Sequence, residues 1–129
     1  MYLSRELPSI GIECSCFGEK EFFSLGLAGY NDGKGVCTFL AAAKYAAGLS
    51  EGISMILTTQ AVYDELSEQG AISDAYGICI VDNPRIAYFK LHNALCNNDD
   101  YMRPQYDTVI APSASIHKMS CIAEKNVTI

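Results

Sequence analysis

Short apolar runs alternate with helix-like spacing over most of this chain. Apolar side chains recur at roughly every second position in residues 10–17, which predicts a first strand, and residues 22–30 predict a second strand interrupted by glycine. Residues 1–8 are short and mixed in character, and we expect them to form an arm. The Asn-Asp-Gly-Lys-Gly segment at 31–35 predicts a tight turn, because glycine tolerates the positive φ angles that such turns need.

Three buried strands and three helices are expected after that turn. β-branched and aromatic residues favour strands, whereas alanine-rich or well-capped segments favour helices. The last helix is expected to bury Ile86, Leu91, Leu95 and one of Tyr88 and Phe89. Strands that alternate with helices predict an α/β domain over residues 1–100, with a small mixed sheet and about three helices. The strands are expected at 36–40, 53–57 and 78–81, and the helices from about Ala41, at 60–69 and at about 85–96.

The last part of the chain follows a different period. Ile110, Ile116 and Ile122 recur every six residues, and a small residue follows each of the first two by four places. A six-residue period predicts the short faces of a β-solenoid, with the aliphatic side chain inside and small residues at the corners. We therefore expect a linker at 101–108 and one solenoid turn at 109–129, the alternative being an ordinary pair of strands.

Composition narrows the classes of partner. The 129 residues carry a formal net charge of -6, and 50% of them are hydrophobic. An acidic surface argues against non-specific binding of nucleic acid or of anionic membranes. No apolar run reaches the roughly 18–20 residues that a membrane-spanning helix needs. The sequence therefore predicts neither a nucleic-acid partner nor a membrane span.

Cysteines and histidines give no metal-binding pattern. Cys14 and Cys16 would point to one face of a strand, but their spacing is not that of a zinc site, and His92 and His117 are the only histidines. We expect no metal and no cofactor. The N-terminus shows no secretory signal pattern, so we expect reduced thiols and a cytoplasmic location. The six cysteines lie at positions 14, 16, 37, 79, 96 and 121.

Two aromatic residues are the candidate ligand-binding groups. Phe39 and Tyr45 lie six residues apart, across the expected joint between the strand at 36–40 and the helix from Ala41. Two rings placed in this way could face each other with a flat ligand between them. The alternative is that both are core aromatics, and the exposure of the two rings separates these possibilities.

Two segments resemble one enzyme family. Residues 38–45, Thr-Phe-Leu-x-x-x-Lys-Tyr, resemble the nucleotide-pocket motif of UDP-3-O-acylglucosamine N-acyltransferase, an enzyme of lipid A biosynthesis. Residues 81–84, Val-Asp-Asn-Pro, are similar to a Val-x-Asn-Pro segment of the same family. The similar order of elements extends over about residues 22–95, and the hexapeptide period after it resembles the family's left-handed β-helix.

The resemblance implies a nucleotide-sugar pocket. In it, Phe39 and Tyr45 would sandwich the uracil of a UDP-sugar, and Lys44 and the N-terminus of the helix from Ala41 would lie near the phosphates. Ala42 stands where the family has an asparagine that hydrogen-bonds the base. The two rings of the motif are thus present, and its base-reading amide is absent.

The resemblance also implies an activity for a longer parent protein. That parent would move an acyl group from acyl carrier protein to the amine of a UDP-glucosamine derivative. In the family, the trimer contacts, the carrier-protein contact and the catalytic histidine belong to β-helix turns that would follow Ile129. We therefore name no catalytic residue, and neither His92 nor His117 is assigned that role. We expect a truncated chain that is inactive alone and monomeric or weakly oligomeric, from a homotrimeric parent.

Two other functions stay open. A related hexapeptide acyltransferase would accept a different sugar, in keeping with Ala42 at the base-reading position. A structural or interaction domain would bind no nucleotide at all, with Phe39 and Tyr45 in its core.

Overall fold

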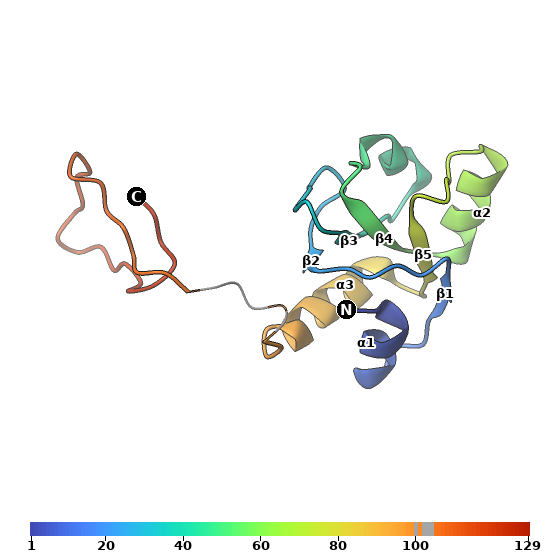
Figure 1. Cartoon of the computed structure of the whole chain (residues 1–129), viewed down its shortest axis with the longest axis horizontal. Coiled ribbons are helices and arrows are strands. Elements are labelled where there is room, and N and C mark those ends of the chain that lie inside the picture. The colour runs from blue at the N-terminus through green and yellow to red at the C-terminus, as the bar shows by residue number, and fades with distance from the viewer. Residues whose placement is uncertain (100, 102–104) are drawn as a thin grey trace.

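Five strands form a mixed sheet at the centre of the N-terminal domain (Figure 1). The computed structural model describes residues 1–99, 101 and 105–129. β2 to β5 run parallel to one another, and β1 is antiparallel to β5 at one edge. The predicted α/β class with a small mixed sheet is therefore confirmed. The strands are β1 (Ser15–Phe17), β2 (Ser24–Leu25), β3 (Val36–Phe39), β4 (Ile53–Thr58) and β5 (Gly77–Ile80), in the spatial order β1-β5-β4-β3-β2.

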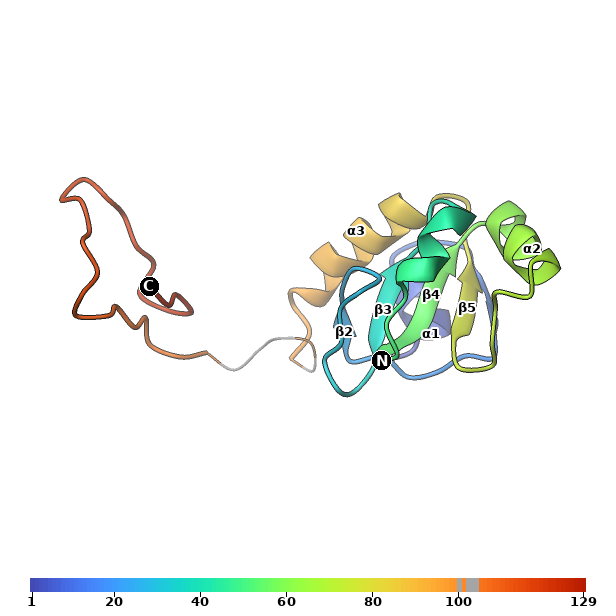
Figure 2. The ribbon, with the colours of Figure 1, turned by 90° about the horizontal axis from the view of Figure 1, so that it is seen from above.

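Helices cover both faces of this sheet. α1 (Leu3–Ser9) and α3 (Pro84–Leu95) lie on one face (Figure 1). The 3₁₀ helix η1 (Ala43–Gly48) and α2 (Gln60–Glu68) lie on the other (Figure 2). η1 and α2 connect β3 to β4 and β4 to β5, and a connection between parallel neighbours must cross over one face of the sheet.

Alternating side chains of β4 enter two separate cores. Met55 and Leu57 pack on the side of α1 and α3, whereas Ile56 packs on the side of η1 and α2. All three side chains are buried. Because both faces of the sheet are covered, its central strands are almost continuously apolar, and such runs can be located from the sequence.

Local signals set the ends of α2 and α3. The Thr59 hydroxyl accepts a hydrogen bond from the Val62 N–H (3.2 Å), and the Asn83 side chain accepts one from the Ile86 N–H (3.1 Å). Gly70 adopts φ of 63° just after α2, which is the left-handed conformation common at helix ends. The two helices end within one residue of the predicted bounds, 60–69 and about 85–96.

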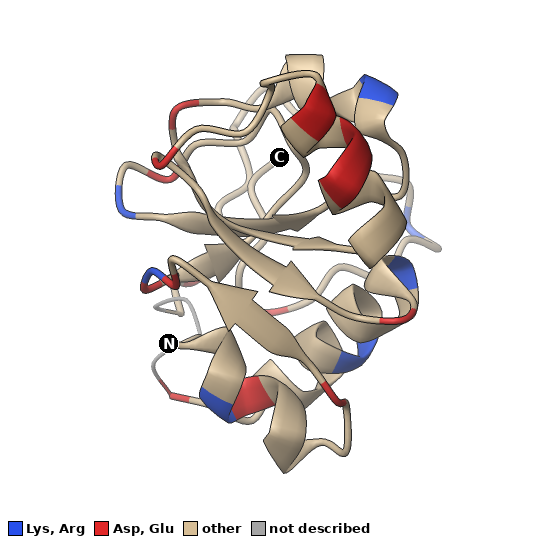
Figure 3. Cartoon of the chain, turned by 90° about the vertical axis from the view of Figure 1, so that its right-hand side faces the viewer, with Lys and Arg blue, Asp and Glu red and all other residues tan. Residues whose placement is uncertain are grey.

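Acidic side chains lie on the exposed face of α2. Asp64, Glu65 and Glu68 are all exposed there, and Figure 3 shows acidic residues on this helix. A face of this charge repels anionic partners. Within the described part of the chain, no helix is long and apolar enough to cross a bilayer.

α3 buries a slightly different face from the predicted one. Tyr88 is the buried aromatic residue, and Phe89 is 53% exposed. Ile86 was expected inside but is 50% exposed, so that prediction was wrong. Ala87 takes the inward position, because it lies one helical turn before the buried Leu91.

Residues 1–8 do not form the predicted arm, and that prediction was wrong. They make up most of α1, where Leu3 and Leu7 are fully buried in the core next to α3. The Met1 ammonium group donates a hydrogen bond to the Phe22 carbonyl (2.8 Å) and fixes the start of the chain. Leu3 and Leu7 are one turn apart, so they share a face, and this packing rather than intrinsic propensity stabilises so short a helix.

Three further elements are shorter than expected. β1 covers only three residues of 10–17, and β2 covers two residues of 22–30. The helix expected from Ala41 is a 3₁₀ helix that begins at Ala43. Ala42 is extended and provides no capping side chain, because a run of alanines contains none of the residues that cap a helix.

The predicted turn at 31–35 is built around one carboxylate. Asp32 accepts hydrogen bonds from the Ser24 hydroxyl (2.6 Å) and from the backbone N–H groups of Lys34 (2.8 Å) and Gly35 (2.7 Å). Gly33 adopts φ of 74°, as the turn requires. Burial alone would raise the pKa of Asp32, but these three hydrogen bonds outweigh it and lower the pKa.

Replacing Asp32 by alanine is expected to lower the free energy of unfolding at pH 7 by about 1–2 kcal/mol, because the turn loses its central acceptor. The native pKa lies below the unfolded value of about 3.9, so the stabilisation is complete above pH ~4 and is lost as the pH falls through the native pKa. Urea unfolding from pH 7 to pH 2 checks this. Asp74→Asn, at an exposed position, is the control. If the free energy of unfolding falls with acid as much in Asp32→Ala as in the parent chain, Asp32 is not the group responsible for that fall.

Residues 105–129 form a loop that returns beside its own beginning. Val109 and Thr128 make an isolated parallel bridge, in which the Val109 N–H donates to Val127 (2.9 Å) and the Ile129 N–H donates to Val109 (3.0 Å). A parallel return without an intervening helix is the connection that a solenoid coil uses, but the same segment also makes an antiparallel bridge between Asp107 and Lys125. Aliphatic side chains of this segment remain partly exposed, among them Ile110 at 44%.

Candidate functional site

An aromatic cluster lies at the carboxyl end of β3. Phe39 is the last residue of that strand, and ligands of parallel α/β sheets commonly bind beyond the carboxyl ends of the strands. Its ring lies 4.9 Å from the Tyr88 ring and 6.4 Å from the Phe89 ring, centroid to centroid. Phe39 is partly buried, Tyr88 is buried with its pKa raised to about 12 by that burial, and Phe89 is half exposed.

Tyr45 and Lys44 form a second group on η1. The Tyr45 ring is 53% exposed, and the Lys44 ammonium nitrogen lies 5.1 Å from its centroid. A cation at this distance is attracted to the face of the ring. The structure therefore brings together a flat apolar surface and a positive charge, the two groups that a nucleotide base and its phosphates would contact.

The predicted site residues fall into these two groups. Phe39 makes its ring contacts with Tyr88 and Phe89, whereas Tyr45 is paired with Lys44. The sequence analysis placed Tyr88 and Phe89 only in the helix after Asn83, not at the site. No local signal could have found them, because their contact with Phe39 depends on how α3 packs across β3.

The helix expected to begin at Ala41, with its N-terminus offered to phosphates, does not begin there. η1 begins at Ala43, has six residues and is a 3₁₀ helix, so it offers no aligned turn of free N–H groups like that of a longer α-helix. That prediction was wrong. Lys44 remains as the cationic group of this region.

A buried hydroxyl lies next to Phe39 in β3. Among the described residues, Thr38 Oγ1 is the buried side-chain polar atom that has no hydrogen-bond partner. On the neighbouring strand, Thr58 Oγ1 is equally buried but donates to the Leu40 carbonyl (3.0 Å). Thr38 thus carries a desolvation cost that Thr58 avoids.

Replacing Thr38 by valine is expected to raise the free energy of unfolding by about 1 kcal/mol, because an unpaired buried hydroxyl becomes a methyl group. Thr58→Val is the matched control and is expected to lower it by about 1 kcal/mol, since it removes a satisfied hydrogen bond. Urea unfolding of both variants checks the difference in sign. Equal destabilisation by the two substitutions would show that the Thr38 hydroxyl has a partner in solution.

Three thiols gather between β1 and β5. Cys16 lies opposite Cys79 in the antiparallel register, and their sulfur atoms are 3.0 Å apart. Cys14 lies two residues before Cys16, and the three sulfur atoms are all within 4.8 Å of one another. Among the cysteine, histidine and acidic side chains of the described residues, these three thiols are the set close enough together to hold a metal ion. This cluster could not be predicted from the sequence, because the pairing of β1 with β5 is not visible in the spacing of Cys14 and Cys16.

The surroundings of these three thiols shift their pKa values in different directions. The hydrogen bond with Cys79 lowers the pKa of the Cys16 thiol, although burial opposes it. Burial, followed by the neighbouring Cys16, raises the pKa of Cys14. The hydrogen bond with Cys16, followed by burial, raises the pKa of Cys79. Of this pair, Cys16 is therefore the thiol that loses its proton more readily.

Comparison with known proteins adds no relatives. No protein-family model matches the chain, and no curated protein sequence matches it. The fold and the site define a small mixed α/β domain with an aromatic cluster at the carboxyl end of β3 and a Tyr45–Lys44 pair on η1. The resemblance to the N-acyltransferase family rests on the motifs at 38–45 and 81–84 and on the hexapeptide period.

Proposed function

We propose that the sheet domain is a nucleotide-sugar-binding domain of an acyltransferase that resembles UDP-3-O-acylglucosamine N-acyltransferase. The observation that carries this proposal is the half-exposed Tyr45 ring on η1 with the Lys44 ammonium group beside it. Tyr45 would stack on a pyrimidine base, and Lys44 would meet a phosphate. Phe39, the second ring of the motif, instead contacts Tyr88 and Phe89 on the side of α3.

The chemistry of this surface suits binding rather than catalysis. Stacking of a base on an aromatic side chain contributes about 1–3 kcal/mol, and a lysine adds a charge-assisted contact to a phosphate. Ala42 provides no side-chain donor or acceptor between the two rings. Recognition of the base edge would therefore be weak, and UDP and CDP are expected to bind with affinities that differ by less than about tenfold.

The acyl transfer itself belongs to the proposed parent protein. There, an amine of a UDP-glucosamine derivative would attack the thioester of acyl carrier protein, which requires a general base and donors for the oxyanion. The parallel bridge between Val109 and Thr128 supports a β-helix start at 109–129, and the parent would be a cytoplasmic homotrimer without a cofactor. None of the catalytic groups is assigned to this chain.

The test is a calorimetric titration of the 129-residue chain with UDP, UMP, CDP and UDP-N-acetylglucosamine. Tyr45→Ala is expected to weaken UDP binding about 5- to 150-fold, which corresponds to the loss of one stacking contact. Tyr2→Ala is the control, because Tyr2 is 46% exposed and precedes α1 on the opposite face of the sheet. Ala42→Asn is expected to tighten UDP relative to CDP by supplying an amide to the base.

A structural role is the second candidate, and the packing of Phe39 favours it. The Phe39 and Tyr88 rings are 4.9 Å apart, which is direct contact within the core on the side of α3. If Phe39→Ala destabilises the fold, and no nucleotide binds the parent chain at millimolar concentration, the structural function takes precedence.

A further inference from the structure

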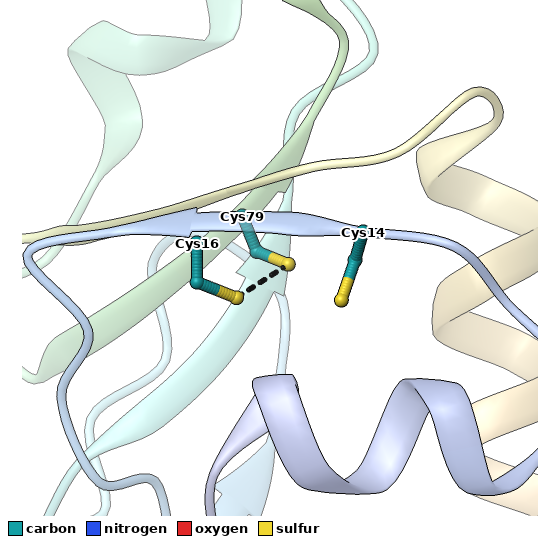
Figure 4. A group of neighbouring side chains, drawn as sticks. All are labelled: Cys14, Cys16 and Cys79. Atoms are coloured by element: carbon teal, nitrogen blue, oxygen red, sulfur yellow. Dashed lines mark hydrogen bonds between the residues drawn. The ribbon is translucent and has the colours of Figure 1, made fainter.

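The three thiols between β1 and β5 point to one side of the sheet. Cys14 and Cys16 alternate with Ser15 along β1 and its N-terminal extension, so their side chains share a face. Cys79 comes from the neighbouring strand. Figure 4 shows all three sulfur atoms on the side that faces α1.

The spacing of these sulfur atoms is close to that of a metal site. Zinc–thiolate bonds of about 2.3 Å in a tetrahedral site place the sulfur atoms about 3.8 Å apart. The observed separations are 3.0 Å for Cys16 and Cys79 and at most 4.8 Å for the whole set. Small side-chain rotations are thus enough to bring the three thiolates around one ion.

We propose that Cys14, Cys16 and Cys79 form a binding site for one thiophilic metal ion, Zn²⁺ or Cu⁺. Thiolates are the ligands that select these two ions over the harder cations. On binding, each thiol that becomes a ligand releases its proton to solvent, and no electron is transferred. Three thiolates complete a trigonal site for Cu⁺, whereas Zn²⁺ would take a water molecule as its fourth ligand.

An ion can reach the cluster from solvent. A groove of about 660 Å³ runs beside β1 and includes Cys14 in its lining, and Cys14 and Cys16 are both partly exposed. Glu13 and Asp82 are also among the residues that line this groove. Glu19, held by the Ser4 backbone N–H (2.8 Å) and hydroxyl (2.7 Å), adds negative charge that acts on Cys14 and Cys16.

The negative surroundings favour a cation over an anionic ligand at these thiols. Although the thiols border the apolar core, Cys14 and Cys16 are partly exposed, and the charge of Glu19 acts on both. This site is independent of the aromatic surface at the end of β3, so the two proposals can fail separately.

The test uses the full chain, reduced with a phosphine and stripped with a chelator, and both reagents are removed under argon before any metal is added. Zinc chloride, and in a separate arm Cu⁺ held in acetonitrile, is added in slight excess, and bound metal is measured after gel filtration. We expect one ion per chain in at least one arm, with an upward shift of the melting temperature. The arm that retains its ion identifies the metal.

Cys14→Ser and Cys16→Ser are each expected to weaken metal binding at least about 100-fold. Loss of a group that only orients a metal ligand already weakens binding by up to about 100-fold, and loss of the ligand itself should cost at least as much. Cys96→Ser is the matched control, since Cys96 is exposed at the end of α3 and outside the cluster, and it should bind like the parent chain. Cys79 is fully buried, so Cys79→Ser requires a separate check of folding without metal.

Three results would overturn the proposal. One is a parent chain that retains substantially less than one equivalent of either ion. The second is a folded Cys14→Ser variant that binds as tightly as the parent. The third is a Cys16–Cys79 disulfide that persists in the phosphine and leaves only one of the three thiols free.

Discussion

Replacing Leu7 by alanine is expected to lower the free energy of unfolding by about 2–5 kcal/mol, the range for large-to-small changes in a packed core. Leu7 is fully buried between the sheet and α3, and its side chain is one of the two that hold α1 in place. Urea unfolding followed by circular dichroism measures the change. Leu27→Ala is the matched control. Because Leu27 is 71% exposed, this substitution should change the free energy of unfolding by no more than about 0.5 kcal/mol.

The same pair of variants decides whether residues 1–8 belong to the fold. If they were the arm that the sequence predicts, Leu7→Ala and Leu27→Ala would have equally small effects. Equal effects would contradict the packing of α1 against the core.

Replacing Gly77 by alanine is expected to destabilise the fold by at least about 1–3 kcal/mol, because the new Cβ has no room. At the start of β5, that Cβ would lie 2.8 Å from the Gly18 carbonyl oxygen and 3.1 Å from the Lys20 nitrogen, and it would also meet the Met55 sulfur. Two of these neighbours are backbone atoms, so the strain cannot be relieved by a side-chain rotation. Thermal or urea unfolding checks the loss.

Gly48→Ala is the control for this substitution. Nothing lies within 4 Å of the Cβ that it would add at the end of η1, and Gly48 does not have a positive φ. We expect Gly48→Ala to be neutral or to stabilise by about 0.4–1 kcal/mol, because alanine restricts the unfolded chain. A Gly77→Ala variant as stable as Gly48→Ala would show that the loop at Gly18 does not approach β5 in solution.

The parts of the fold that could be predicted are those with local signals. β4 is a continuous apolar run, and Thr59 and Asn83 cap the helices that follow their strands. α1 could not be predicted, because it is short, contains Pro8 in its last turn and depends on contacts with distant residues. The pairing of β1 with β5 joins residues far apart in the sequence, so no local pattern reveals its register.

The candidate site also has a part that could be predicted from the sequence and a part that could not. Phe39 and Tyr45 could be found from their spacing around a predicted joint. The contacts of Phe39 with Tyr88 and Phe89 depend on how α3 crosses the sheet, which the sequence does not specify. The approach of Cys79 to Cys16 likewise depends on the register of an antiparallel pair.

The most direct test of the proposed nucleotide site is an NMR titration of the chain, labelled in its aromatic rings, with UDP. If the base stacks on Tyr45, the uracil proton signals and the Tyr45 ring signals will shift upfield together and will saturate at a common ligand concentration. The Tyr2 ring, on the other face, will not shift. If millimolar UDP leaves the Tyr45 ring signals unchanged, no base stacks there, and the nucleotide-binding function is contradicted.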